Sequence, residues 1–244
     1  MNVLDLFSGI GGFALGTEAA GWTTVAFCEK EPFAQSILKK HWPGVPIYDD
    51  VEKLTADRLV RDGIGVDVIC GGWPCQDIST SGLRAGLEGS RSGLWREVCR
   101  LVRDLRPKYA VLENVSALLF RGLGDVLRDL AEIGYDAEWH CIPASAVGCH
   151  HGRDRIWIVA YPKGERRGSI LQESRLFQET LQHSARSASD CRAFYAPDAR
   201  RILRESDPRI LRVADGIPNR IHRIRVIGNA VVPKIPQLIA EAIN

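Results

Sequence analysis

Short apolar runs alternate with amphipathic stretches along the first two thirds of the chain, and this alternation constrains the fold more than any other feature. Apolar runs typical of strands lie at residues 3–6, 23–28, 66–70, 109–112, 137–142 and 156–160. Stretches typical of helices lie at residues 13–20, 33–41, 92–105, 126–133 and 235–243. Strands that alternate with helices predict an α/β domain in which helices cover both faces of a mostly parallel sheet.

The pattern changes after residue 161. Residues 163–212 are rich in Arg, Ser, Gln and Glu and have few periodic apolar positions, which predicts a small subdomain or a long insertion. Residues 1–152 carry 15 Lys and Arg against 20 Asp and Glu, a net charge of −5, whereas residues 153–225 carry 16 against 9, a net charge of +7. Fifteen of those 16 bases are arginine, whose forked side chain suits phosphates and guanine edges, although a solvated surface explains the charge equally well.

The composition is that of an ordinary globular protein, with 45% hydrophobic and 25% charged residues. No apolar run is long enough to span a bilayer, and the first seven residues lack the basic start and cleavage site of a signal peptide. The seven cysteines are odd in number and scattered, which indicates free thiols in a reducing compartment. We therefore expect a cytoplasmic protein that does not bind membranes.

A glycine-rich loop, Phe-Ser-Gly-Ile-Gly-Gly at residues 7–12, joins the first predicted strand to the first predicted helix. Glycines at this point allow a tight turn and let a ligand approach the backbone. Glu29 follows the second predicted strand, where an acidic residue commonly binds the ribose of a nucleoside. These features favour a nucleoside cofactor and leave both NAD and S-adenosylmethionine open, although the spacing departs from the dinucleotide pattern Gly-x-Gly-x-x-Gly.

Cys75 follows an apolar strand and is preceded by a proline, in the stretch Trp-Pro-Cys at residues 73–75. Ligands of open α/β sheets bind outside the carboxyl ends of the strands, so we expect Cys75 to face such a crevice. Pro74 fixes its own backbone and favours an extended Trp73, which suits a thiol held in place as a nucleophile. The alternative is a buried structural cysteine, which is how we interpret Cys70 and Cys99.

Glu113 ends the next predicted strand, so the same geometry directs it into the same crevice. A partly desolvated carboxyl group there would have its pKa raised toward about 6–7 and could act as an acid, and the alternative is a surface glutamate. Arg153 and Arg155 alternate with Asp154 and therefore project to one side of their strand, either toward this crevice or into solvent.

Several blocks of the sequence resemble the C5-cytosine DNA methyltransferase family in order and spacing. They are the glycine loop at 7–12, Gly-Trp-Pro-Cys-Gln at 72–76, Glu-Asn-Val at 113–115, His-Gly-Arg-Asp-Arg at 151–155 and Gly-Asn-Ala-Val-Val-Pro at 228–233. The match spans nearly the whole chain except about residues 162–212. The resemblance implies a Rossmann-like S-adenosylmethionine-dependent methyltransferase fold. Residues 1–161 and 222–244 would form the catalytic domain, and residues 162–221 a small target-recognition region.

The resemblance also implies a chemistry for the residues at the crevice. Cys75 would attack C6 of cytosine, Glu113 would hold and protonate N3, and Arg155 with Arg153 would contact the O2 atom. The activated C5 then takes the methyl group. Because the base cannot be reached inside a duplex, it would be flipped out of the DNA.

The cofactor implied by the resemblance is S-adenosylmethionine, with S-adenosylhomocysteine as the product and no metal. The glycine loop would surround its methionine part and adenine, Glu29 would bind the ribose, and Asp50 with Val51 would contact the adenine. The predicted cofactor-binding residues are Phe7, Gly9, Ile10, Gly11, Gly12, Glu29, Asp50, Val51, Pro74 and Asn229.

The predicted substrate contacts are Gln76 in the cysteine block and Ser81 and Arg91 in a loop, residues 81–94, that would close over the flipped base. Three features depart from the family pattern. His151 stands where the family has Gln, the recognition region is short, and residues 212–218 fit their block only loosely. The catalytic set is intact, so the resemblance implies an active DNA (cytosine-5-)-methyltransferase of bacterial or phage origin. We expect it to act on double-stranded DNA as a cytoplasmic, nucleoid-associated monomer.

Three alternatives stay open. A tRNA cytosine-5 methyltransferase shares the core, but its cysteine block usually reads Pro-Pro-Cys instead of Trp-Pro-Cys. A catalytically silent DNA-binding homologue is disfavoured by the intact Cys75, Glu113 and Arg155. A nicotinamide dehydrogenase would need an acid or base to handle the hydride, and no residue suggests one. The recognition sequence, and a role in restriction–modification, in a phage or alone, are not fixed by the sequence.

Overall fold

The computed structural model of the protein describes residues 1–74, 93–149, 151–164, 170 and 229–244. The described residues form a seven-stranded sheet with the strand order β3-β2-β1-β4-β5-β7-β6. The strands are β1 (Asn2–Leu6), β2 (Thr23–Cys28), β3 (Ile47–Tyr48), β4 (Val68–Gly72), β5 (Tyr109–Val115), β6 (Tyr135–Pro143) and β7 (Asp154–Pro162). The helices are α1 (Gly12–Ala19), α2 (Pro32–His41), α3 (Ala56–Arg61), α4 (Gly93–Leu105), α5 (Leu118–Arg121), α6 (Leu123–Glu132), the short 3-10 helix η2 (Ala144–Val147) and α12 (Lys234–Ile243).

The sheet is mostly parallel, as predicted. The neighbours from β3 to β5 all run in one direction, and only β7 is antiparallel, to both β5 and β6. The carboxyl ends of β1, β2, β4 and β5 therefore meet at one edge of the sheet, which we call the carboxyl edge. Because β7 runs the opposite way, it brings its first residues to this edge: Arg155 pairs with Val115 at the end of β5.

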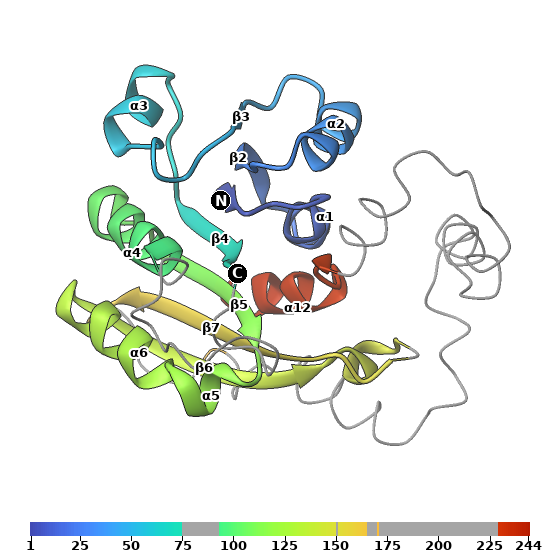
Figure 1. Ribbon diagram of the computed structural model, residues 1–244, viewed down its shortest axis with the longest axis vertical. Helices are drawn as coiled ribbons and strands as arrows, with labels where there is room; N and C mark the ends of the chain where they lie inside the picture. The colour runs from blue at the N-terminus through green and yellow to red at the C-terminus, as the bar shows by residue number, and fades with distance from the viewer. Residues whose placement is uncertain (75–92, 150, 165–169, 171–228) are drawn as a thin grey trace, which may run out of the picture.

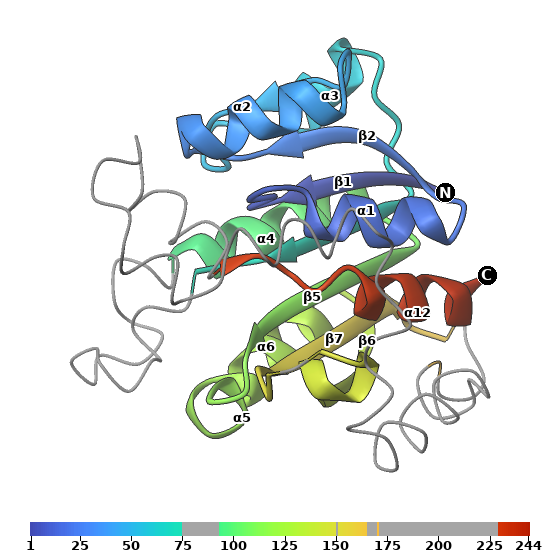
Figure 2. The ribbon, with the colours of Figure 1, turned by 90° about the vertical axis from the view of Figure 1, so that its right-hand side faces the viewer.

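Helices cover both faces of the sheet (Figures 1 and 2). One face packs against α3, α4 and α6, and its apolar cluster includes Leu59, Trp95 and Val126. The other face packs against α1 and α12, which lie side by side in Figure 2, and its cluster includes Phe13 and Ile239. Strands enclosed in this way must be apolar on both faces, which explains their nearly continuous hydrophobic runs.

Local sequence explains where the main helices begin and end. On α4, Trp95, Val98, Leu101 and Val102 are buried, and this spacing gives the helix one apolar face. Pro32 occupies the first turn of α2, where its missing N–H costs nothing. The side chain of Thr55 accepts a hydrogen bond from the N–H of Arg58 and so caps α3.

The structure adds four short elements to those predicted: the two-residue β3, the six-residue α3, the four-residue α5 and the 3-10 helix η2, which are too brief to give a clear periodic signal. It also moves strand boundaries: β4 runs to Gly72, two residues beyond the predicted strand, and β5 runs to Val115, three residues beyond the predicted one. All but residues 162–164 and 170 of the predicted recognition region lie outside the described residues. Among the described helices, none combines the length and apolar character needed to cross a bilayer.

Candidate active site

The glycine loop is held in a strained, open conformation at the end of β1. Phe7 has a φ of 53°, which is unusual for a residue with a side chain, and Gly9 and Gly11 have φ values of 54° and 85°. The N–H of Gly9 donates to Oε2 of Glu29 over 2.7 Å, and the N–H of Glu31 donates to Oε1 of the same carboxylate over 2.8 Å. Glu29 therefore fastens the loop to the end of β2, with lone pairs left for a further donor.

Two glycines of the loop allow close packing. A Cβ atom on Gly11 would lie 2.5 Å from the ring of Trp42, and one on Gly12 would lie 2.6 Å from the carbonyl oxygen of Val231. Val231 is two residues from Asn229, so the C-terminal segment lies against the loop as the predicted role of Asn229 requires. Asn229 itself is exposed.

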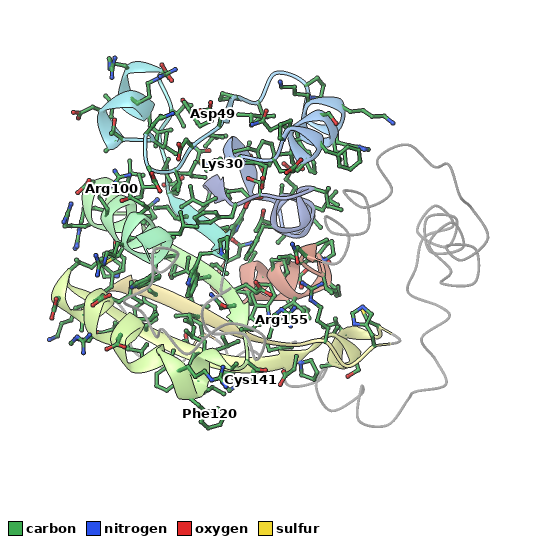
Figure 3. The ribbon with its side chains drawn as sticks, viewed as in Figure 1. Lys30, Asp49, Arg100, Phe120, Cys141 and Arg155 are labelled. Carbon is green, nitrogen blue, oxygen red and sulfur yellow. The ribbon has the colours of Figure 1, made fainter. Side chains whose placement is uncertain are left out.

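Carboxylates gather around the ends of β2 and β3. Burial, followed by the nearby charges of Glu29, Asp50, Asp49 and Asp5, raises the pKa of the Cys28 thiol to about 12. Figure 3 shows Asp49 at this end of the sheet, beside the labelled Lys30 and away from Arg155. This concentration of negative charge attracts a cationic ligand and repels a diphosphate group.

Asp5 is a buried acid that was not among the predicted site residues. Its side chain is 0% exposed, and neither carboxyl oxygen has a hydrogen-bond partner among the described residues. Burial raises the pKa of this carboxyl well above its usual range, and the charge of Glu29 acts in the same direction. The sequence signal is an acid inside the apolar strand Val-Leu-Asp-Leu, just before the glycine loop.

The turn after β3 carries the two residues predicted to contact adenine. Oδ1 of Asp50 accepts the N–H of Glu52 over 3.1 Å, and the carbonyl of Asp50 accepts from Lys53 and Leu54. The side chain of Val51 is 5% exposed and packs into the core. The turn is thus compact, and it lies at the carboxyl edge next to the end of β2.

Glu113 and Arg155 form a buried ion pair at the carboxyl edge. Nε of Arg155 lies 2.9 Å from Oε1 of Glu113, and the side chains are 24% and 11% exposed. Burial raises the pKa of Glu113, and this effect outweighs the opposing charges of Arg155 and Arg153. Arg153 and Arg155 are both partly buried, burial lowers the pKa of Arg153, and the charges of both arginines act on Glu113 to lower its pKa.

The end of β4 lies directly beside Glu113. Gly72 pairs with Glu113 in the sheet, and a Cβ atom on Gly72 would lie 2.8 Å from Oε2 of that glutamate. The side-chain amide of Asn114 donates to the carbonyl of Trp73 over 3.2 Å, so β5 also holds the residue that precedes Pro74. Asn114 is 2% exposed, and its role was not predicted, although it belongs to the Glu-Asn-Val block.

Four predicted residues, Cys75, Gln76, Ser81 and Arg91, lie outside the described residues. Pro74 is described and is exposed at the end of β4. Burial raises the pKa of Cys70 well above its usual range, and burial followed by the charge of Asp129 raises that of Cys99 to about 11. These two thiols are therefore kept protonated, in agreement with the structural role predicted for them.

A model of the C-5 cytosine-specific DNA methylase family matches residues 1–206. The type II methyltransferase M2.BsuMI of Bacillus subtilis is 36% identical over 168 residues, which cover 66% of this chain and 42% of the relative. The type II methyltransferase M.CviJI of Paramecium bursaria Chlorella virus IL3A is 36% identical over 163 residues, covering 66% of this chain and 43% of the relative. The chain thus spans less than half the length of these two relatives.

Solved structures agree with the sequence relatives. A DNA modification methyltransferase encoded within an E. coli prophage superposes with a TM-score of 0.57 at 28% identity, over 67% of this chain and 47% of the other. The Dnmt2 methyltransferase of S. pombe superposes with a TM-score of 0.58 over 78% of this chain and 56% of the other, and at 19% identity it supports the fold alone. Since the family model matches far more than half of the residues, the chain belongs to the C-5 cytosine-specific DNA methylase family.

Proposed function

We propose that the protein transfers a methyl group from S-adenosylmethionine to C5 of a cytosine in double-stranded DNA, through a transient bond between Cys75 and C6 of a flipped-out base. The observation that carries this proposal is the buried Glu113–Arg155 pair beside Gly72. Only two residues separate Gly72 from Cys75 in the sequence, and on this ground we assign the thiol to the neighbourhood of this carboxyl group of raised pKa and its guanidinium partner.

Each of these residues has a defined task in the reaction. The thiolate of Cys75 forms a bond to C6 while protonated Glu113 donates its proton to N3, so that no negative charge builds up on the ring. Arg155, with Arg153 beside it, is suited to contact the O2 atom of the base. After the methyl group is joined to C5, a base removes the C5 proton, the electrons of that C–H bond expel the thiolate, and the N3 proton returns to Glu113.

The chemistry of the cofactor pocket supports S-adenosylmethionine over a dinucleotide. S-adenosylmethionine, when bound, supplies an activated methyl group on a positively charged sulfur. The carboxylates Glu29, Asp49 and Asp50 favour a cationic ligand and disfavour the diphosphate of NAD. The N–H of Gly9, which could otherwise bind a phosphate, already donates to Glu29. We assign the ribose to Glu29 and the adenine to the turn of Asp50 and Val51.

We also propose double-stranded DNA as the substrate and assign its recognition to residues 162–221, the arginine-rich part of the chain. Gln76, Ser81 and Arg91 are the proposed contacts to the flipped base and its surroundings. Basic side chains that contact phosphates release counterions, so binding of duplex DNA should weaken steeply as the salt concentration rises. The relatives named type II methyltransferases support a DNA substrate.

Trapping on DNA that contains 5-fluorocytosine tests the whole proposal, because fluorine at C5 cannot be removed as a proton and the adduct persists. A pool of random duplexes avoids the need to know the recognition sequence. With S-adenosylmethionine present, we expect an adduct stable to denaturing electrophoresis with the native protein and none with Cys75→Ser. DNA binding without an adduct would identify a silent DNA-binding homologue, and methyl transfer to tRNA but not to duplex DNA would identify a tRNA enzyme.

A further inference from the structure

We propose that Arg100 is a positioning residue for the cofactor: it fixes the turn at residues 50–54 in the shape that receives the adenine ring. This inference rests on the proposed function, since it takes S-adenosylmethionine as the ligand of that turn. Arg100 itself is remote from the reacting atoms and belongs to α4, a helix that carries no predicted site residue. Figure 3 shows it on the side of α4 that faces α3.

The contacts of Arg100 converge on the backbone of the turn. Its Nη2 atom donates to the carbonyl oxygen of Val51 over 3.1 Å and to that of Leu54 over 2.8 Å. Its Nε atom donates to Oε2 of Glu97 over 2.6 Å, and the same carboxylate oxygen lies 2.6 Å from Nη2. Glu97 therefore sets the orientation of the guanidinium group, and the guanidinium group joins two carbonyls three residues apart.

The shape of the turn depends on the hydrogen bonds from Arg100, because the side chains of the turn are anchored in the core and its carbonyl groups are anchored by the guanidinium group. Val51 and Leu54 are 5% and 2% exposed, so their side chains are fixed in the core. Their carbonyl oxygens lie beneath Arg100, whose own side chain is only 23% exposed. Loss of the guanidinium group would leave two carbonyls without this donor in a partly buried position, and the turn would relax to find others. Asp50 and Val51 would then move from the adenine ring.

The position of α4 adds a second consequence. Near its start, Trp95 packs on Trp73 with ring centroids 5.0 Å apart, and Nε1 of Trp95 donates to Asp129 over 2.7 Å. One 13-residue helix therefore contacts both the adenine turn and the end of β4 that leads to Cys75. The helix, through Arg100 at the turn and Trp95 at Trp73, connects the proposed cofactor side of the site to the side that carries the proposed nucleophile.

The test measures how well the protein distinguishes adenine from hypoxanthine. S-adenosylhomocysteine and S-inosylhomocysteine differ in the exocyclic amino group of the base, which the turn of Asp50 and Val51 is placed to read. Titration calorimetry would give both affinities for the native protein, Arg100→Ala and Arg100→Lys. Arg103→Ala is the matched control, because Arg103 lies one turn further along α4, is 59% exposed and pairs with Asp104.

For Arg100→Ala we expect affinity for S-adenosylhomocysteine to fall about tenfold or more, the scale of two lost hydrogen bonds from a charged donor. Affinity for S-inosylhomocysteine should fall less, so the preference for adenine shrinks. Arg100→Lys keeps a charged donor without the planar fork and should recover part of the preference. Arg103→Ala should stay within about twofold of the native protein for both ligands.

Thermal unfolding of each variant separates this role from general support of the fold. Unchanged affinities in Arg100→Ala would overturn the proposal. An equal loss of affinity for both ligands would also overturn it and make Arg100 a structural residue only. The same conclusion would follow if the affinities of Arg100→Ala and Arg100→Lys both fell in step with their melting temperatures. If the native protein binds neither ligand, the cofactor assignment itself is wrong, and the inference falls with the proposed function.

Discussion

The two halves of the sheet build their parts of the site in different ways. On the side of β1, β2 and β3, backbone groups and carboxylates from parallel strands meet at the carboxyl edge, with Glu29 fastening the glycine loop. On the side of β5, β7 and β6, Glu113 meets Arg155, 42 positions further along the chain, because β7 is antiparallel. The first half is suited to binding, whereas the second holds charges in the low-polarity surroundings that acid–base chemistry needs.

Cofactor binding and methyl transfer should therefore be separable by mutation. Substitutions on the β5–β7 side should change the rate of methyl transfer and leave cofactor affinity nearly constant. Substitutions in the glycine loop should change affinity and stability together. The four predictions below test this separation, beginning with the largest expected effect.

Glu113→Gln should lower the single-turnover rate of methylation by about a hundredfold to ten-thousandfold, because glutamine can hold N3 but cannot protonate it. Affinity for S-adenosylhomocysteine should stay within about threefold of the native value, as measured by calorimetry. Glu132→Gln on the exposed surface of α6 is the control and should change neither quantity. A parallel collapse of cofactor affinity in Glu113→Gln would show that the two halves are not separable.

Arg155→Ala should raise the pKa of Glu113 further, because the native guanidinium charge and hydrogen bond both lower it. The rate should fall about tenfold to a hundredfold through loss of the contact to the base. Its pH profile should shift, so that the decline caused by ionisation of Glu113 begins at a higher pH. Carbon-13 NMR of the Glu113 carboxyl group would follow the same change. Arg155→Lys keeps a positive charge and should shift the pH profile less. If Arg155→Ala had the same pH profile as the native protein, the pairing of Glu113 with Arg155 would be refuted.

Gly12→Ala should destabilise the fold by about 1–3 kcal/mol, since its methyl group would lie 2.6 Å from the carbonyl oxygen of Val231. Because Val231 is part of the segment that carries Asn229, affinity for S-adenosylhomocysteine should fall as well. Gly65→Ala, whose Cβ meets nothing within 4 Å, should remain within about 0.5 kcal/mol of the native protein. Urea unfolding with and without ligand would measure both effects. Native stability in Gly12→Ala would mean that the segment packs differently.

Asp5→Asn should alter how stability depends on pH. The folded-state pKa of Asp5 is raised, so the folded protein retains a proton that the unfolded chain releases as the pH rises above the ordinary value. This contribution makes native stability fall with rising pH, by about 1.4 kcal/mol per unit, until the raised pKa is reached. Asparagine cannot ionise, so urea midpoints measured between pH 4 and 8 should fall less steeply in the variant. Identical slopes would mean that the native carboxyl ionises normally.

Much of this architecture could be predicted from the sequence. The alternation of strands and helices and the mostly parallel sheet followed from apolar periodicity, whereas Glu113, predicted to end its strand, lies two residues before the end of β5 at Val115. The antiparallel direction of β7 could not be read in that way, because an apolar run does not encode the direction in which it pairs. The sequence alone therefore does not predict the contact between Glu113 and Arg155.

Other features were missed for physical reasons that the residues make clear. Asp5 lies in an apolar strand. Its sequence context predicts that the side chain is buried, but it does not predict that the carboxyl oxygens lack hydrogen-bond partners among the described residues. Arg100 has the appearance of a solvated base on an amphipathic helix, and only its hydrogen bonds to Val51 and Leu54 set it apart. Long-range contacts between polar side chains and the backbone leave no periodic signal in a sequence.

The reversal of β7 also places the start of the proposed recognition region, residues 162–221, far from the reacting groups. The strand starts beside Glu113 and runs for nine residues, so Gly164 lies about 25 Å away, at the opposite margin of the sheet. Gly164 is exposed and has a φ of 82°, which is the geometry of a turn. A fluorophore or an engineered sensor domain attached at this turn would enter remote from the reacting groups. The fold thus provides a natural attachment point for reporters of DNA engagement.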